Sequence, residues 1–266
     1  RIKQGNIDLC GEDIVAANEK KMQDIRGRLV SMIFQDPMTC LNPTMKVGRQ
    51  LTEAICQHRK LSKDEAKKEA VRLLEMVQIP NAAERAEQYP HEFSGGMRQR
   101  AMIAMAMSCE PKLLIADEPT TALDVTIQAQ ILDLMNDLRE SYDTSVIMIT
   151  HDLGVIAETC EQVAVFYAGQ VVEQTDVNTL FHAPAHPYTE GLLRSVTSLS
   201  GAQKELYTIR GTVPTAGNFS SGCRFADRCT HCTEQCRKSI PPLSEIEPGH
   251  LCRCFLHSKK ETEGQA

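Results

Sequence analysis

Two apolar segments constrain the fold of this chain more than any other feature. They are KLLIAD, residues 112–117, and TSVIMIT, residues 144–150, and residues 126–141 between them are predicted to form a helix. Apolar strands that alternate with helices are typical of a parallel sheet that is buried on both faces. We therefore predict an α/β fold, in a chain whose 266 residues suffice for a full hydrophobic core.

Other segments extend this pattern. Short strands are predicted over residues 5–14 and 28–36, a hairpin over 162–174, and helices over 18–28, 62–79, 94–111 and 152–160. Ser62 and Glu65 have the spacing of a capping box at the start of one helix. The turn of the hairpin is expected at Ala168–Gly169.

A pair of neighbouring carboxylates, Asp117 and Glu118, ends the first apolar strand. Ligands bind at the carboxyl edge of parallel sheets, and two adjacent carboxylates there favour a cation as their partner. Nucleotide hydrolases have this arrangement in the Walker B motif, where Asp117 would hold Mg²⁺ through water and Glu118 would polarise the attacking water. The alternative is a strand end whose acids cap the next helix.

Three further segments favour nucleotide chemistry. FSGGMRQR, residues 93–100, places a Ser and two Gly at a helix start, where backbone N–H groups can bind an anion. Gln35 and His151 each follow a predicted strand and are expected at the same sheet edge as Glu118. Taken singly, they would be a helix cap and two polar residues at strand ends. Their order and separations together indicate one site.

The segments FQDP, SGGMRQR, LLIADEP, TALD and ITHD together resemble the ATPase subunit of ABC transporters, over residues 1 to about 174. The resemblance implies an ABC-type ATPase of the P-loop NTPase fold that uses ATP and Mg²⁺. It implies catalytic roles for Gln35 of the Q-loop, Glu118 of Walker B and the switch histidine His151. It also implies nucleotide contacts, which involve Asp117 (to Mg²⁺, via water), Gln35, Ser94, Gly95, Gly96, Gln99 and, in the D-loop, Asp124.

One element of such an ATPase is missing from the sequence. The phosphate loop has the pattern G-x-x-x-x-G-K-[ST], and no Gly of this chain is followed by Lys. Because Arg1 is not a natural start, we expect the loop to precede it, so that the chain is a fragment whose fold lacks its N-terminal part. We expect the fragment alone to be inactive. In the family, two ATPases dimerise head to tail, so Ser94 and Gly96 could still serve a partner's nucleotide.

Two segments narrow the resemblance to one group of ABC transporters. APAHPYTEGLL, residues 183–193, resembles the region after the ATPase core in oligopeptide and dipeptide importers and their nickel relatives. MIFQDPMTCLNP and VAVFYAGQVVE look more like the first of the two ATPases of these systems, the D-type. The resemblance implies an energy-coupling subunit of a bacterial peptide importer, with nickel or another small solute as the alternative cargo. From physical grounds alone, His186-Pro187-Tyr188 would be a Pro-stiffened turn.

Six of the eleven cysteines lie between residues 223 and 254, which indicates a local metal site in a reducing compartment rather than disulfides. The family motif matches Cys223, Cys229, Cys236 and Cys254, and in relatives these positions look like ligands of a [4Fe-4S] cluster. This chain adds Cys232 and Cys252. The spacing of Cys229 and Cys232 would equally suit zinc, and free thiols are the third alternative.

The expected domains follow from these motifs. They are an incomplete ATPase domain over residues 1–178 with a helical subdomain at about 36–100, a linker with the HPY region over 179–222, a cysteine-rich metal-binding module over 223–254 and a flexible tail over 255–266. The expected partners are a second ATPase subunit, two transmembrane permease subunits and, indirectly, a substrate-binding protein. The net charge of -6 argues against nucleic acid.

The apolar runs are far shorter than the ~20 residues of a membrane-spanning helix, so a membrane role would have to come through a partner. The resemblance implies a peripheral protein at the cytoplasmic face of the inner membrane. Two other classes are considered. A non-transport ATPase of translation or DNA repair would be expected to show twin cassettes or a long coiled coil. A regulatory or metal-sensing protein with a vestigial ATPase core is disfavoured by the intact Glu118 and His151.

Overall fold

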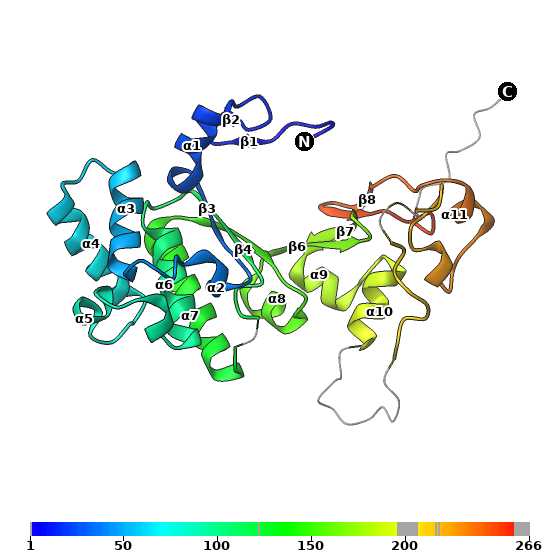
Figure 1. Cartoon of the computed structure of the whole chain (residues 1–266). Helices are drawn as coiled ribbons and strands as arrows, with labels where there is room; N and C mark the ends of the chain where they lie inside the picture. Colours follow the sequence, from blue (N-terminus) through cyan, green and yellow to red (C-terminus); the bar gives the residue numbers. More distant parts are fainter. Residues whose placement is uncertain (1, 122, 196–206, 216, 218, 258–266) are drawn as a thin grey trace. The chain divides into compact units, whose positions relative to one another are not determined.

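The chain forms two compact units, Arg1–His151 and Asp152–Ala266. The computed structural model describes residues 2–121, 123–195, 207–215, 217 and 219–257 (Figure 1). From residue 258 on, the tail expected from the sequence lies outside the described residues, as does 196–206 of the expected linker.

The first unit is built on a parallel sheet, as predicted. Its strands are β3 (Val30–Ile33), β4 (Leu113–Asp117) and β5 (Ser145–Ile149), in the order β3-β4-β5. β4 pairs with both neighbours in parallel, with Ile33 opposite Ala116 and Asp117 opposite Ile149. The carboxyl ends of all three strands therefore meet at one edge.

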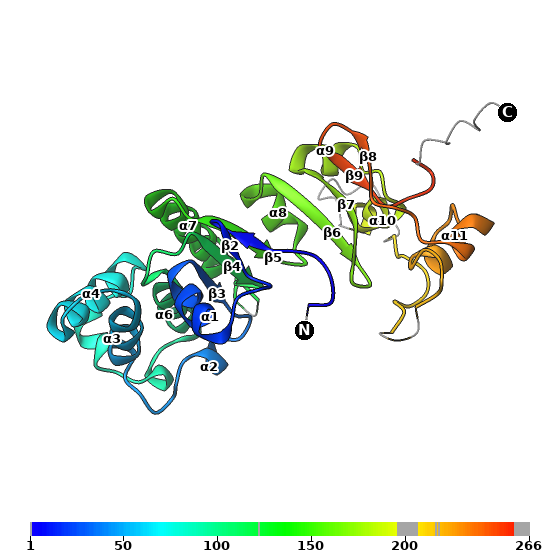
Figure 2. The ribbon, with the colours of Figure 1, turned by 90° about the horizontal axis from the view of Figure 1, so that it is seen from above.

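Two helices next to the sheet complete the core of this unit (Figure 2). They are α6 (Gly95–Met107), which is largely buried from Gln99 onward, and α7 (Val125–Tyr142), which buries one face. The prediction that β5 is buried on both faces is wrong. Ile147 and Ile149 are 50% and 47% exposed, because only the opposite face of β5, with Val146 and Met148, packs against the core.

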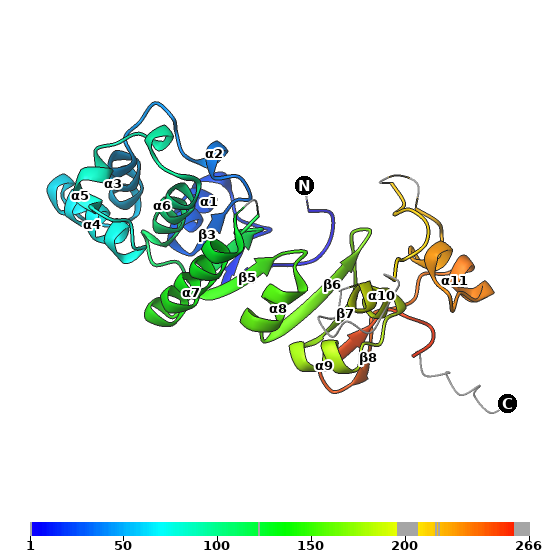
Figure 3. The same ribbon diagram turned by 90° about the horizontal axis from the view of Figure 1, so that it is seen from below.

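The segment between β3 and α6 is rich in helices, most of which lie at one end of the unit (Figure 3). It consists of α2 (Pro37–Cys40), α3 (Val47–His58), α4 (Lys63–Met76), α5 (Ala82–Ala86) and the 3-10 turn Pro90–Glu92. The capping box is confirmed: the Glu65 N–H donates to Ser62 Oγ at 3.3 Å and the Ser62 N–H donates to Glu65 Oε2 at 2.8 Å. The apolar stripe of α4 faces the core of the first unit.

The N-terminal segment differs from its prediction. Instead of one strand over 5–14, it forms a small hairpin of β1 (Asp8–Leu9) and β2 (Glu12–Asp13), followed by α1 (Glu19–Arg28). Cys10 and Gly11 have φ values of 54° and 81°, so the chain reverses between the strands. Turns of this kind favour glycine, which the sequence supplies at only one of the two positions.

The second unit contains a four-stranded antiparallel sheet of β6 (Gln162–Tyr167), β7 (Gln170–Asp176), β8 (Ser244–Glu247) and β9 (His250–Cys252), in the order β6-β7-β9-β8. The predicted hairpin turn is confirmed, with φ values of 47° at Ala168 and 79° at Gly169. Its helices are α8 (Leu153–Thr159), α9 (Val177–His182), α10 (Pro187–Ser195), the 3-10 turn Ala226–Arg228 and α11 (Glu234–Lys238).

The pairing of β9 with β7 places Cys252 opposite Glu173. The end of the cysteine-rich segment thus joins the same sheet as the hairpin of β6 and β7. Across the described part of both units, no helix has the length and apolarity needed to cross a membrane.

Candidate functional site

Three of the residues singled out in the sequence meet at the carboxyl edge of the first sheet. Glu118 directly follows β4, whereas Gln35 and His151 each lie two positions beyond β3 and β5. Gln35 Nε2 donates a hydrogen bond to Glu118 Oε2 at 2.7 Å, and His151 Nδ1 lies 3.1 Å from Glu118 Oε1. The parallel register explains this convergence, because it brings residues distant in sequence to the same edge.

The backbone and surroundings of Glu118 fix its side chain. Its φ is 46°, in the left-handed region, and its N–H donates to the Ile149 carbonyl at 2.8 Å. The hydroxyl of Thr121 donates to Glu118 Oε2 at 2.8 Å. This bond, followed by that of His151, holds the pKa of Glu118 below its ordinary value, so the carboxylate is ionised at neutral pH. Thr121 was not predicted as a site residue, although it lies only three positions after Glu118.

Asp117 and His151, at the same edge, differ in exposure. Asp117 is the last residue of β4 and is half-buried beside Glu118. The His151 side chain is 77% exposed, so its ring can reach a ligand that approaches from solvent. Together, the edge presents two carboxylates, an amide and an imidazole, a set that can hold a hydrated divalent cation and orient a water molecule.

The signature residues lie at the start of α6. Ser94 is the N-cap and its Oγ accepts from the Met97 N–H at 3.3 Å, while Gly95 is exposed with open space around it. A Cβ at Gly96 would come within 3.2 Å of the Ile127 methyl group Cγ2, so α6 closely approaches α7 at this point. The N–H groups of this helix start favour an anion.

Gln99 and Asp124 connect the helices to the segment after β4. The buried Gln99 donates through Nε2 to the carbonyl of Pro119, the residue after Glu118. Asp124 is the N-cap of α7, and its Oδ1 accepts from the Ile127 N–H at 3.0 Å. Capping of α7 is therefore the role of Asp124 and not of Asp117 or Glu118, for which capping was the alternative explanation. It leaves the Asp124 side chain exposed at the surface of the unit.

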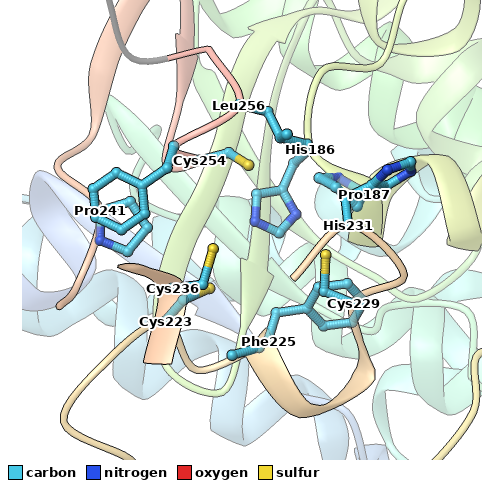
Figure 4. A pocket seen from close by; sticks show the side chains of 12 residues that line it. His186, Pro187, Cys223, Phe225, Cys229, His231, Cys236, Pro241, Cys254 and Leu256 are labelled. Carbon is cyan, nitrogen blue, oxygen red and sulfur yellow. The ribbon is translucent and has the colours of Figure 1, made fainter. Parts of the chain in front are cut away.

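The second unit contains a pocket lined by four cysteines, Cys223, Cys229, Cys236 and Cys254 (Figure 4). These are the four that match the family motif, whereas Cys232 and Cys252 do not line the pocket. Cys223 and Cys236 are held together because the Cys223 N–H donates to the Cys236 carbonyl at 2.7 Å. A Cβ at Gly222 would overlap that carbonyl, so glycine is required for this approach.

The thiols of this pocket are partly removed from water. Burial raises the pKa of Cys223 and Cys229 and raises the pKa of Cys254 to about 11. Thiols in such surroundings remain protonated at neutral pH unless a cation compensates the thiolate charge. Within the described ranges, no three His, Cys, Asp or Glu side chains are grouped so as to hold a metal ion. The four thiols thus surround the pocket without forming a closed site for one ion.

The HPY segment also contributes to this pocket. Pro187 begins α10, and the preceding His186 is 2% exposed and lines the pocket together with the cysteines (Figure 4). Burial lowers the pKa of His186 to about 4, with Glu173 acting in the opposite direction. A Pro-stiffened turn therefore describes the backbone but not the buried ring. Sequence reasoning did not single out Glu173, which lies in the middle of β7.

Comparison with known proteins finds two family models in this chain. The model described as ABC transporter matches residues 1–121, and the model described as oligopeptide/dipeptide transporter, C-terminal region, matches residues 172–236. The chain is 50% identical over 263 residues to the oligopeptide transport ATP-binding protein AppD of Bacillus subtilis, covering 99% of this chain and 80% of the relative. It is 54% identical over 255 residues to OppD of the same organism, covering 96% and 71%.

OppD of Escherichia coli is 50% identical over 251 residues, which cover 94% of this chain and 74% of the relative. Among solved structures, the dimeric post-hydrolysis state of the ATP-binding cassette MJ0796 bound to ADP and Pi matches with a TM-score of 0.59 and 25% identity. That match covers 66% of this chain and 74% of the cassette.

Proposed function

Because the chain belongs to the ABC transporter ATP-binding proteins, in the group of oligopeptide and dipeptide transport, we propose that its sheet edge hydrolyses ATP to drive peptide import. The observation that carries this proposal is the convergence of Gln35, Glu118 and His151. An ionised carboxylate held between an amide and an imidazole can take up the proton of an attacking water.

The residues at this edge fit Mg²⁺ and ATP. Bound Mg-ATP would supply the phosphoryl group and the positive charge that the two carboxylates compensate. Asp117 would hold the cation through water, Gln35 would contact the cation and the water, and Glu118 would accept the proton of that water. His151 would hold a terminal phosphate oxygen. The phosphate loop is not part of these 266 residues, so they supply the water-activating part of the site.

The partners follow from the family and from the exposed elements. We assign a second ATPase subunit, placed head to tail, to the start of α6 and to Asp124. The open space at Gly95 and the 84% exposure of Val125, next to Asp124, support this assignment. The helices between Gln35 and Ser94 would transmit the motion to two permease subunits at the cytoplasmic face of the inner membrane, with a substrate-binding protein acting on the other side.

The test of the ATPase role is Glu118→Gln in the transporter assembled from the complete subunit and its membrane partners. The amide keeps the shape of the side chain but cannot accept the proton, so we expect turnover to fall at least about 100-fold while ATP still binds. Glu140→Gln, at an exposed position on α7, is the matched control. Normal turnover by the Glu118 variant would exclude this residue as the base.

For the cysteine pocket we propose a [4Fe-4S] cluster held by Cys223, Cys229, Cys236 and Cys254, with zinc as the alternative. Four thiols that line one pocket can supply one thiolate to each of the four iron atoms of such a cluster. The centre would offset the cost of burying thiolates and stabilise a segment with few apolar residues. Iron and sulfide in anaerobically purified protein, with absorption near 400 nm, would support the cluster; zinc without iron would support the alternative.

A further inference from the structure

The ring of His186 has no part in the ATPase chemistry, yet it is among the most deeply buried side chains of the protein. Figure 4 shows it projecting between Cys254, Cys236 and Cys229. A buried histidine whose only purpose is packing would be surrounded by apolar groups. Here one side of the ring faces Phe225, with ring centroids 5.7 Å apart, and the pocket of thiols opens beside it.

The hydrogen bonds of His186 identify which nitrogen carries its proton. The backbone N–H of Tyr188 donates to Nδ1 at 3.1 Å. A backbone N–H is always a donor, so Nδ1 must be unprotonated and the proton of the neutral ring is on Nε2. In the described part of the chain, no hydrogen bond uses Nε2. The ring lines the pocket, so this N–H can donate to a group that occupies the pocket.

A buried carboxylate fixes the position of this ring. Glu173 is fully buried and accepts the N–H groups of Ala185 at 2.7 Å and His186 at 2.9 Å. Its Oε1 also lies 2.8 Å from Nε2 of the buried His250, which begins β9 and leads through Cys252 to Cys254. One carboxylate therefore holds both the backbone of the HPY segment and the strand that delivers a pocket cysteine.

The geometry favours a hydrogen-bond donor over a metal ligand. Four cysteines already line the pocket and can supply one thiolate to each iron of a cluster, which leaves no iron for His186 to ligate. Histidine N–H groups that point at the sulfur atoms of a metal centre tune its affinity and its reduction potential.

We propose that His186 is a positioning residue that donates its Nε2–H to a sulfur atom of the metal–sulfur centre held by Cys223, Cys229, Cys236 and Cys254. The residues of the HPY motif would then have separate roles. Pro187 starts α10, and the N–H of Tyr188 fixes the tautomer in which His186 Nε2 carries the proton. The inference rests on the cluster in the proposed function. A donor to sulfur stabilises the more negative, reduced state, so it raises the reduction potential.

The experiment uses the full chain, purified anaerobically, supplied with ferrous iron and sulfide, and titrated for its reduction potential. In His186→Asn the side-chain oxygen can accept from the Tyr188 N–H as Nδ1 does, but no donor stands at the position of Nε2. In His186→Gln the amide nitrogen can replace that donor. His182→Asn, at an exposed histidine of α9, is the matched control. We expect a lower potential in His186→Asn at unchanged iron content, and potentials near that of the unsubstituted protein in the other two variants.

An unchanged reduction potential in His186→Asn would overturn the inference but not the cluster proposal. An equal shift of the potential in His186→Asn and His186→Gln would do the same. Failure of the unsubstituted protein to take up iron and sulfide would overturn both proposals. A second measurement uses the unsubstituted protein, so that it does not depend on the folding of a variant. In protein labelled with ¹⁵N in the histidine rings, the reduced cluster should show one weak nitrogen coupling, and this coupling should persist in His231→Asn, because His231 also lines the pocket. A strong coupling would show that a histidine ligates the cluster, and the absence of a coupling would show that no histidine donates to it. Either result would contradict the proposal.

Discussion

Glu118 has a backbone conformation that residues with a side chain rarely adopt, and the hydrogen bonds around it explain why it persists. Its N–H is bonded to Ile149, and its carboxylate receives bonds from Gln35 and Thr121 as well as contacting His151. Backbone strain of this kind costs about 1–3 kcal/mol and is typical of functional sites. The surroundings thus hold the carboxylate at the sheet edge before any ligand binds.

The hydroxyl of Thr121 contributes most to the lowered pKa of Glu118, so removing this hydroxyl tests the arrangement directly. Thr121→Val deletes the hydroxyl that donates to Oε2, so the pKa of Glu118 should rise toward its ordinary value. Because the folded-state pKa is lowered, the ionised form is favoured above that pKa and is lost as pH falls through it. The check is a ¹³C NMR titration of the Glu118 carboxyl.

Thr121→Ser keeps the hydroxyl and is the control, with a titration close to that of the unsubstituted chain. Equal titration midpoints in Thr121→Val and the unsubstituted chain would show that the hydroxyl does not stabilise the carboxylate. The part of the lowering that His151 and Gln35 cause should remain in both variants, because their contacts to Glu118 do not involve Thr121.

Between elements, the contact of α3, α4 and the end of α6 depends on one ion-pair group. Glu69 of α4 is bound by Arg72 at 2.7 Å and by Arg59 at 3.0 Å, and Arg59 also donates to the Ser108 carbonyl at 3.3 Å. These contacts, Arg72 first, lower the pKa of Glu69 to about 2. The Glu69 side chain is only 14% exposed, so this group is less screened by solvent than a surface pair.

We predict that Glu69→Gln lowers the free energy of unfolding of the chain by about 1–2 kcal/mol at pH 7, after allowance for the exposed Arg72. The contribution of Glu69 is fully present above its unfolded pKa and is lost as pH falls toward about 2, so the two proteins should converge in acid. Urea unfolding at pH 7 and below pH 4 measures this. Glu53→Gln, in an exposed pair on α3, should change stability by less than about 0.5 kcal/mol at either pH. A pH-independent loss in Glu69→Gln would assign the effect to packing.

The sequence predicted elements best where periodicity and turn chemistry are local. The parallel strands, the capping box at Ser62 and the turn at Ala168–Gly169 each depend on neighbouring residues, and the structure has them. Parallel strands also brought Gln35, Glu118 and His151 to one edge. The exposed face of β5 could not be predicted, because an apolar run does not reveal whether a second layer covers it.

Glu173 shows what such reasoning misses. It lies in a hairpin strand where an acid is usually solvent-facing, and its burial depends on partners up to 77 positions away. Only the return of β9 to β7 brings His250 and the HPY segment together around it. The choice of four cysteines from six was available from the family pattern, whereas the presence of His186 among them required the fold.

On the scale of the whole chain, the two candidate sites lie in separate units, the sheet edge in the first and the cysteine pocket in the second. Each is assembled from contacts within its own unit. Substitutions at His186 should therefore change the properties of the proposed metal centre while Glu118 keeps its partners. The family assignment rests on both units, since one family model matches in each.

The last prediction concerns the catalytic competence of these 266 residues by themselves. The water-activating residues are present, but no Gly-Lys pair provides the amides and the lysine that hold the β- and γ-phosphates. Losing even one such electrostatic contact typically costs about 100–1000-fold in rate, so we expect turnover by the isolated chain to be at least about 100-fold below that of the assembled transporter. The measurement is phosphate release with Mg²⁺ and ATP, made in parallel on Glu118→Gln. Activity from a contaminating ATPase would be equal in the two preparations. A turnover near that of the assembled transporter that is lost in Glu118→Gln would mean that this chain binds the phosphates with other groups, and it would contradict the prediction.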